Sequence, residues 1–186
     1  MSKLINDDEA PWELYDVTYE ILTTLGIPGP ALVLMVSDNL RAYMQFMDDE
    51  ENSTIRITIT PDEFISVARI KEICKEASPV DMYIKLIRNN TELVFEDDAV
   101  PMAVMYLILL LHEIGHLQHG TLLCTHGYNI QKLKDATSLS ISNKTLPNIL
   151  KYSLDPFELY ADAFVCEHYK LIHELYYDKV AAIFTN

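Results

Sequence analysis

Hydrophobic positions in the first third of the chain follow two different spacings. Between residues 10 and 25 they fall three or four apart, which predicts a helix. Beyond the glycines and prolines at 26–30, three short segments rich in apolar and β-branched residues predict strands: 31–36, 40–47 and 53–60. Turn-forming residues at 37–39 favour a hairpin between the first two strands. We therefore expect a small antiparallel sheet.

Helix-start signals follow from residue 60 onward. Residues 60–63 combine an N-cap threonine, a first-turn proline and a glutamate three residues after the cap, which predicts a helix to about residue 77. A further helical stretch is expected from Pro79 toward residue 88. The next helix is long and apolar, runs from about residue 101 to 119, and is expected to end with Gly120 as its C-cap.

The C-terminal part also reads as helical. Residues 121–154 are polar and mixed, with short helices at most, and 155–158 begin a final helix that runs into the 170s or to about 183. The pattern predicts one α+β domain over residues 1–186. Its sheet-containing part is about 1–100, its central helix 101–119 and its helical part 120–186.

Charge and composition exclude several kinds of partner. The 186 residues carry a formal net charge of −14, so neither a nucleic acid nor an anionic membrane surface is expected to bind. The apolar run at 99–111 is shorter than the roughly 20 residues of a spanning helix. Acidic residues at 7–9 stand where a signal peptide needs an apolar core. With Cys74, Cys124 and Cys166 far apart, we expect a cytoplasmic protein without disulfides.

One motif places polar side chains on the long apolar helix. Residues 112–116 read His-Glu-Ile-Gly-His, and positions four apart lie on one helix face. His112 and His116 would therefore aim two imidazoles at one ion, about 2 Å away if it is zinc. Glu113, about 100° around the helix from His112, can act as a general base without binding the metal. A hydrogen-bonded cluster with no metal is the alternative.

A catalytic zinc site ordinarily has three protein ligands, so a third must lie elsewhere. His119 is about 10 Å from His112 along the helix axis, too far for a straight helix to bring both to one ion. The extended pattern with a third histidine also fails, since His119 replaces its glycine and Leu122 replaces its histidine. The remaining candidates are His126, Glu158, His168 and His173.

Glu158 is the best of these candidates. It lies in the segment Asp-Pro-Phe-Glu-Leu-Tyr-Ala-Asp-Ala-Phe, residues 155–164, and a carboxylate completes His₂Glu zinc sites. Asp162 follows one turn later on the same face, where it can accept the N–H of a ligating imidazole. The competing interpretation makes Glu158 the glutamate of a capping box that begins at Asp155.

The pair of segments HEIGH and ELYAD resembles the gluzincins, the zincin metallopeptidases whose third ligand is a glutamate. Within them, HEIGHLQHG and ELYADAF are similar to the motifs of the ImmA/IrrE family and of the phage-exclusion Lit-like peptidases. The resemblance implies a zincin-like α+β fold, with a small antiparallel sheet on the active-site helix. It also implies one Zn²⁺ ion on His112, His116 and Glu158, with Glu113 as base and Asp162 behind a ligand.

The resemblance also implies how a substrate binds. In zincins an edge strand pairs with the extended substrate, and residues 54–60 are our candidate for that strand; the alternative is an ordinary core strand. A developing oxyanion needs a donor besides the metal. The candidates for this or another substrate contact are His119, His126, Tyr128, Tyr152 and Tyr160. His119 could instead cap the C-terminus of its helix.

The expected function is that of a cytoplasmic zinc endopeptidase acting on a protein or peptide. The families that the chain resembles cleave regulators or translation factors in stress or phage response. Control would then come from substrate recognition or from a regulatory partner protein. Two alternatives are a non-enzymic, zinc-stabilised interaction module and an enzyme that hydrolyses a non-peptide amide.

Overall fold

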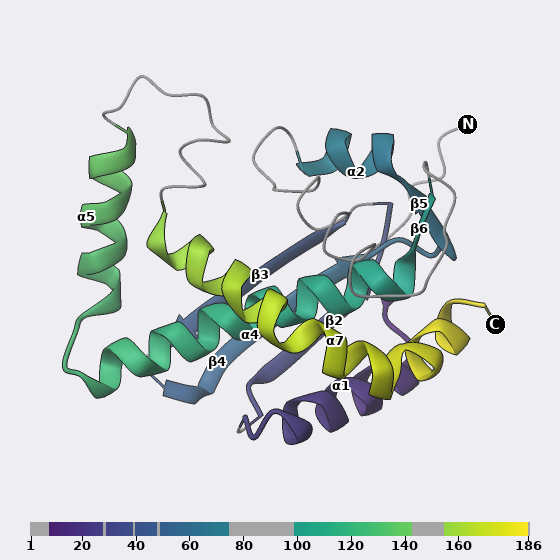
Figure 1. The fold of residues 1–186 in the computed structure, drawn as a ribbon, viewed down its shortest axis with the longest axis horizontal. Helices are drawn as coiled ribbons and strands as arrows, with labels where there is room; N and C mark the ends of the chain where they lie inside the picture. Colours follow the sequence, from purple (N-terminus) through teal and green to yellow (C-terminus); the bar gives the residue numbers. More distant parts are fainter. Residues whose placement is uncertain are drawn as a thin grey trace.

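The computed structural model describes residues 8–27, 29–38, 40–47, 49–74, 99–142 and 155–185. They form a mixed α+β fold with a helical C-terminal part (Figure 1). Its elements in chain order are β1 (Asp8–Glu9), α1 (Trp12–Thr24), β2 (Ala31–Val36), β3 (Arg41–Met47), β4 (Asp49–Ile59), β5 (Phe64–Ser66), α2 (Val67–Cys74), β6 (Ala99–Pro101), α4 (Met102–Thr125), α5 (Ile130–Ser142) and α7 (Pro156–Phe184).

The larger sheet is mixed rather than antiparallel. Its strand order is β1-β2-β4-β3, with β2 parallel to β4 and β3 antiparallel to β4. The expected hairpin between β2 and β3 is therefore wrong, because β4 lies between them. The core-facing side chains of β4 are at most 1% exposed: Ile55, Ile57 and Ile59. A strand buried in this way is stabilised most when it pairs with a strand on each side.

This strand order also corrects the expected substrate strand. Residues 54–60 were expected at an edge, but β4 occupies an interior position and pairs on both sides. The edge of the sheet on that side is β3, Arg41–Met47. Both strands contact α4, so the sheet still lies against the helix that carries the motif.

The helix expected from Thr60 begins later. Residues 64–66 instead form β5, which pairs antiparallel with β6 at residues 99–101. Helix α2 then begins at Val67, and the Oγ atom of Ser66 accepts a hydrogen bond from the backbone N–H of Arg69. The capping signal at 60–63 was overridden by strand pairing with a distant segment. The helix expected from Pro79 lies outside the described residues.

The long motif-bearing helix is confirmed but extends further than expected. Helix α4 continues to Thr125, so Gly120 is not its C-cap and is buried within it. The helix ends at His126, followed by Gly127 with a φ of 79°, a conformation that glycine adopts without steric cost. Residues 130–142 then form a 13-residue helix, α5, where only short helices were expected.

Helix α4 lies in the middle of the molecule. It packs against α7 on one side and against β3 and β4 on the other (Figure 1). From Met102 to Leu111 only Leu109 is partly exposed, which explains why this stretch is apolar on all sides rather than on one. No helix in the described parts of the chain is long and apolar enough to cross a bilayer.

Candidate metal centre

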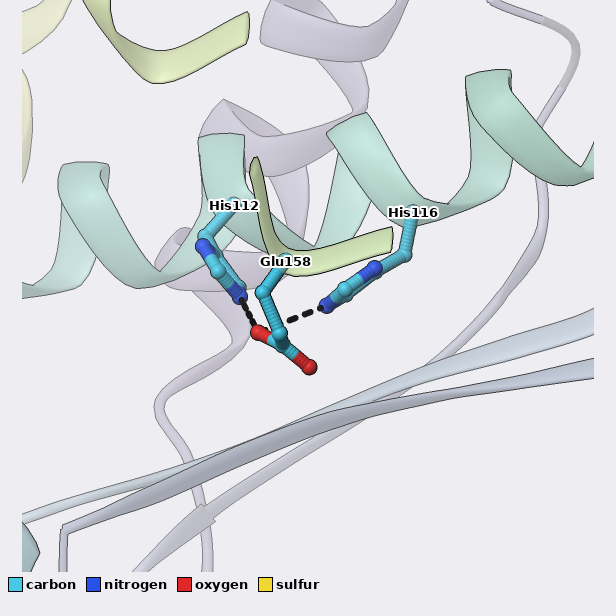
Figure 2. A group of neighbouring side chains, drawn as sticks. All are labelled: His112, His116 and Glu158. Atoms are coloured by element: carbon cyan, nitrogen blue, oxygen red, sulfur yellow. Dashed lines mark ion pairs between the residues drawn. The ribbon is translucent and has the colours of Figure 1, made fainter. Parts of the chain in front are cut away.

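Two crossing helices bring the predicted ligands together. His112 and His116 project from α4, and Glu158 projects from the first turn of α7 toward both rings (Figure 2). The Oε2 atom of Glu158 lies 3.2 Å from Nε2 of His112 and 3.6 Å from Nε2 of His116. One ligand atom from each of the three side chains lies within 4.8 Å of the others. The predicted ligand set is therefore assembled in space.

These distances suit a small metal ion. Two ligand atoms bound tetrahedrally to zinc at 2.0–2.1 Å are about 3.4 Å apart, close to the separations of Glu158 from the two imidazoles. The side chains of His112, His116 and Glu158 are only 12%, 14% and 27% exposed. Two imidazoles and one carboxylate form a donor set that binds zinc or a related transition metal. The residues present therefore fit a metal ion.

Glu158 points at the histidines even though it also begins a helix. The N-cap of α7 is Asp155, whose Oδ1 accepts a hydrogen bond of 2.9 Å from the backbone N–H of Phe157. The cap thus uses the aspartate, and the glutamate carboxylate lies against His112 and His116. The capping-box interpretation therefore holds for Asp155 and not for Glu158, whose carboxylate lies where a ligand to the same ion as the two histidines would lie.

Asp162 lies behind the first histidine, as expected. Its Oδ1 atom is 3.2 Å from Nδ1 of His112, so the two ring nitrogens of His112 face carboxylates from successive turns of α7. A carboxylate in this position fixes the ring orientation and would keep Nε2 directed at a metal ion bound beside Glu158.

The carboxylates make His112 a strong base. Burial alone would lower its pKa, but the hydrogen bonds with Asp162 and Glu158 outweigh burial and raise it to about 9. Burial would likewise raise the pKa of Glu158, yet His112 and His116 hold it well below the ordinary 4.5. These shifts favour an ion pair between His112 and Glu158 in the metal-free protein, so a metal cation that bound here would displace a proton.

Glu113 differs from the other acids of the site. It is 4% exposed, and its Oε2 atom has no hydrogen-bond partner among the described residues. Burial raises its pKa, and the neighbouring His112 and His116 offset this only in part. A buried carboxylate oxygen without a partner is costly to maintain, which is consistent with a group kept for chemistry.

The remaining candidates lie outside the ligand group. His119 stacks on Tyr160, with ring centroids 4.4 Å apart, and lies 5.0 Å from Phe157. His126 is exposed at the end of α4, with its Nδ1 atom 2.8 Å from the carbonyl oxygen of Leu122, and Tyr128 is 55% exposed. Tyr152 lies outside the described residues. A substrate or oxyanion role for these residues stays a prediction.

His168 and His173, the weaker candidates for the third ligand, are half-buried on α7 against aromatic rings. The ring centroid of His168 is 4.2 Å from that of Phe164, and the ring centroid of His173 is 4.6 Å from that of Tyr177. Neither histidine belongs to the metal-binding group found among the described residues.

One residue near the site was missed by the sequence analysis. Lys134 of α5 places its Nζ atom 5.5 Å from the centre of the Phe157 ring, next to the first turn of α7. Its charge also acts to lower the pKa of both Glu113 and His119. Lys134 reaches the site because α5 places it beside the first turn of α7. The sequence of α5 gives no indication of this position.

No family model, curated protein or solved structure matches this chain. The functional argument therefore depends on the residues and geometry of the site.

Proposed function

We propose that this chain is a zinc-dependent peptidase that hydrolyses a peptide bond in a protein substrate. The observation that carries the proposal is a group of two histidines and a glutamate that could hold a metal ion, beside the buried carboxylate of Glu113, whose Oε2 atom has no hydrogen-bond partner among the described residues. When bound, zinc supplies a Lewis acid that polarises a carbonyl and makes water at the site more acidic.

Glu113 has the properties of the acid–base group. It accepts the proton of the attacking water and then delivers that proton to the leaving amine. Its raised pKa, caused by burial, brings it closer to the neutral range where one group performs both transfers well. During both proton transfers, Asp162 keeps the His112 ring in place through its contact with the Nδ1 atom of that ring.

An extended peptide is the substrate that the sheet favours. Strand β3 is the edge of the sheet and contacts α4, the helix with the catalytic motif. An edge strand offers backbone groups to which a substrate can add as a further strand. We therefore assign the substrate strand to Arg41–Met47 instead of residues 54–60.

The motifs also support placing the chain in the gluzincin type, near the ImmA/IrrE-like and Lit-like peptidases. On this proposal it has a zincin-like fold, acts in the cytoplasm, and cleaves a regulatory or translation protein in a stress or phage response. The alternative, a zinc-stabilised interaction module, gives no reason to keep a buried glutamate oxygen that has no hydrogen-bond partner in the described part of the chain.

The test compares wild type with Glu113→Gln. Both proteins, loaded with one equivalent of Zn²⁺, are incubated with a proteome-derived peptide library, and new termini are identified by mass spectrometry. We expect cleavage by wild type alone, with both proteins retaining zinc. Equal cleavage by the two proteins would remove Glu113 from the mechanism. Zinc binding by wild type without any cleavage would support the interaction module instead.

A further inference from the structure

Helices α4 and α7 touch through their backbones at one point. A Cβ atom added at Gly115 would lie 2.7 Å from Cα and 3.2 Å from the carbonyl oxygen of Ala161. It would also lie 3.0 Å from Cβ of Phe164. All three atoms belong to the backbone or to its first side-chain carbon, so no change of rotamer removes the contact. Only glycine at position 115 permits this helix separation.

On each helix, the residue at the contact lies between two residues of the proposed metal site in the sequence. On α4, Gly115 stands between His112 and His116; on α7, Ala161 stands between Glu158 and Asp162. The crossing therefore sets how far the carboxylates of one helix lie from the imidazoles of the other. If α7 moved outward here, Glu158 and Asp162 would both move away from His112.

We infer that Gly115 is a positioning residue, which holds α7 close enough to α4 for Glu158 to share a metal ion with the two histidines. The inference depends on the proposed metal site. Metal–ligand distances tolerate changes of about 0.2 Å. The added Cβ atom would lie 2.7 Å from Cα of Ala161, whereas ordinary van der Waals contact lies at 3.4–4 Å. The helices must therefore separate by more than that tolerance.

Helix propensity acts in the opposite direction, which makes the inference easy to test. Replacing an interior helical glycine that has no packing role with alanine makes the helix more stable. If Gly115 had no such role, Gly115→Ala would raise the melting temperature and leave the metal affinity unchanged.

The experiment measures the Zn²⁺ dissociation constant by chelator competition for wild type and three variants. Gly115→Ala should weaken binding by about 10- to 100-fold, the range found when support of a ligand is lost. Val165→Ala, at a buried position of α7, should lower the melting temperature without changing the dissociation constant. Gly29→Ala, whose added Cβ meets only the Tyr19 ring at 3.6 Å, should change neither. Unchanged zinc affinity in Gly115→Ala would overturn the inference.

A second readout does not need bound metal. A crystal structure of metal-free Gly115→Ala should show His112 farther than 3.2 Å from both Glu158 and Asp162. If wild type binds no zinc, the proposed function fails, and these distances then decide only whether Gly115 sets the separation of Glu158 and Asp162 from His112. If Gly115→Ala does not fold, Ala161→Val, which adds bulk at the buried residue that faces Gly115, replaces it in both measurements. Unchanged distances would again overturn the inference.

Discussion

Two segments of α4, the apolar segment 102–111 and the motif segment 112–116, bury polar side chains but satisfy them differently. In the apolar segment, the hydroxyl of Tyr106 is hydrogen-bonded to Oγ1 of Thr18, which in turn donates to the carbonyl oxygen of Leu14. In the motif segment, His112 lies between two carboxylates of α7. Glu113 beside it has a buried oxygen with no partner among the described residues. The hydroxyls of Tyr106 and Thr18 are neutral and hydrogen-bonded to each other. The groups at His112 and Glu113 are charged, and one carboxylate oxygen among them has no hydrogen-bond partner among the described residues.

Because of this difference, we expect one segment of α4 to contribute to stability and the other to metal binding or catalysis. A neutral hydrogen bond contributes modestly to stability and is complete without a ligand. Buried charges that lack partners persist where they have another role, such as metal binding or proton transfer. Substitutions in the apolar segment of α4 should therefore change stability alone, and those in the motif segment should change metal binding or activity.

The largest effect is expected from Glu113→Gln. Loss of a general acid–base group should reduce kcat by about 10²- to 10⁴-fold. The melting temperature should hold or rise, because burial already disfavours the charged form of this carboxylate. Kinetics on a cleaved peptide and a thermal melt check both parts. A large loss of stability in this variant would make Glu113 a structural residue and erase the contrast.

Zinc affinity should depend on pH through His112. Its pKa is raised to about 9 in the metal-free protein, so below that pH the metal must displace a proton. Affinity should therefore rise by about tenfold per pH unit up to about pH 9. Chelator competition at several pH values measures this slope. A flat profile between pH 6.5 and 9 would contradict the pairing of His112 with Asp162 and Glu158.

The metal-free protein should show the opposite trend in stability. The contribution of His112 is fully present below its ordinary pKa of 6.5 and is lost as the pH rises to about 9. Glu158, whose pKa is lowered, contributes above its ordinary 4.5, and this contribution is lost as the pH falls below that value. Thermal melts without zinc should therefore give the highest stability between about pH 4.5 and 6.5, whereas added zinc should stabilise most near pH 9. Identical pH optima with and without zinc would argue against this ion pair.

The smallest effect is expected in the apolar segment of α4. Tyr106→Phe removes one hydrogen bond to Thr18 and should reduce the free energy of unfolding by about 1 kcal/mol. Zinc affinity should not change, since the Tyr106 hydroxyl is hydrogen-bonded to Thr18 of α1 and Tyr106 does not belong to the group that could hold a metal ion. Denaturant unfolding and zinc competition test the two statements. A weaker zinc affinity in this variant would show that the two segments of α4 are coupled.

The parts of the site that follow helical periodicity could be predicted from the sequence. His112 and His116 share a face because they are four residues apart, and Glu158 and Asp162 do so for the same reason. The capping signal of Asp155 fixed the start of α7. Local backbone geometry determines all of these features.

Features that depend on distant pairing could not be predicted. The parallel pairing of β2 with β4 leaves no trace in the turn residues at 37–39, which are compatible with a hairpin. The pairing of β5 with β6 overrode a good helix start at Thr60. Gly120 looks like a helix terminator until the packing that buries it is known. The closeness of α4 and α7 at Gly115 is likewise visible only in three dimensions.

The zinc content of wild type and Glu158→Ala tests the central claim most directly. Glu167→Ala is the matched control, because Glu167 lies on the same helix and its side chain is 76% exposed. Wild type and Glu167→Ala should each hold one zinc ion per chain after dialysis. Glu158→Ala should lose it, with affinity reduced by more than the about 100-fold typical of losing an outer partner. Full retention of zinc by Glu158→Ala would contradict the metal centre described above.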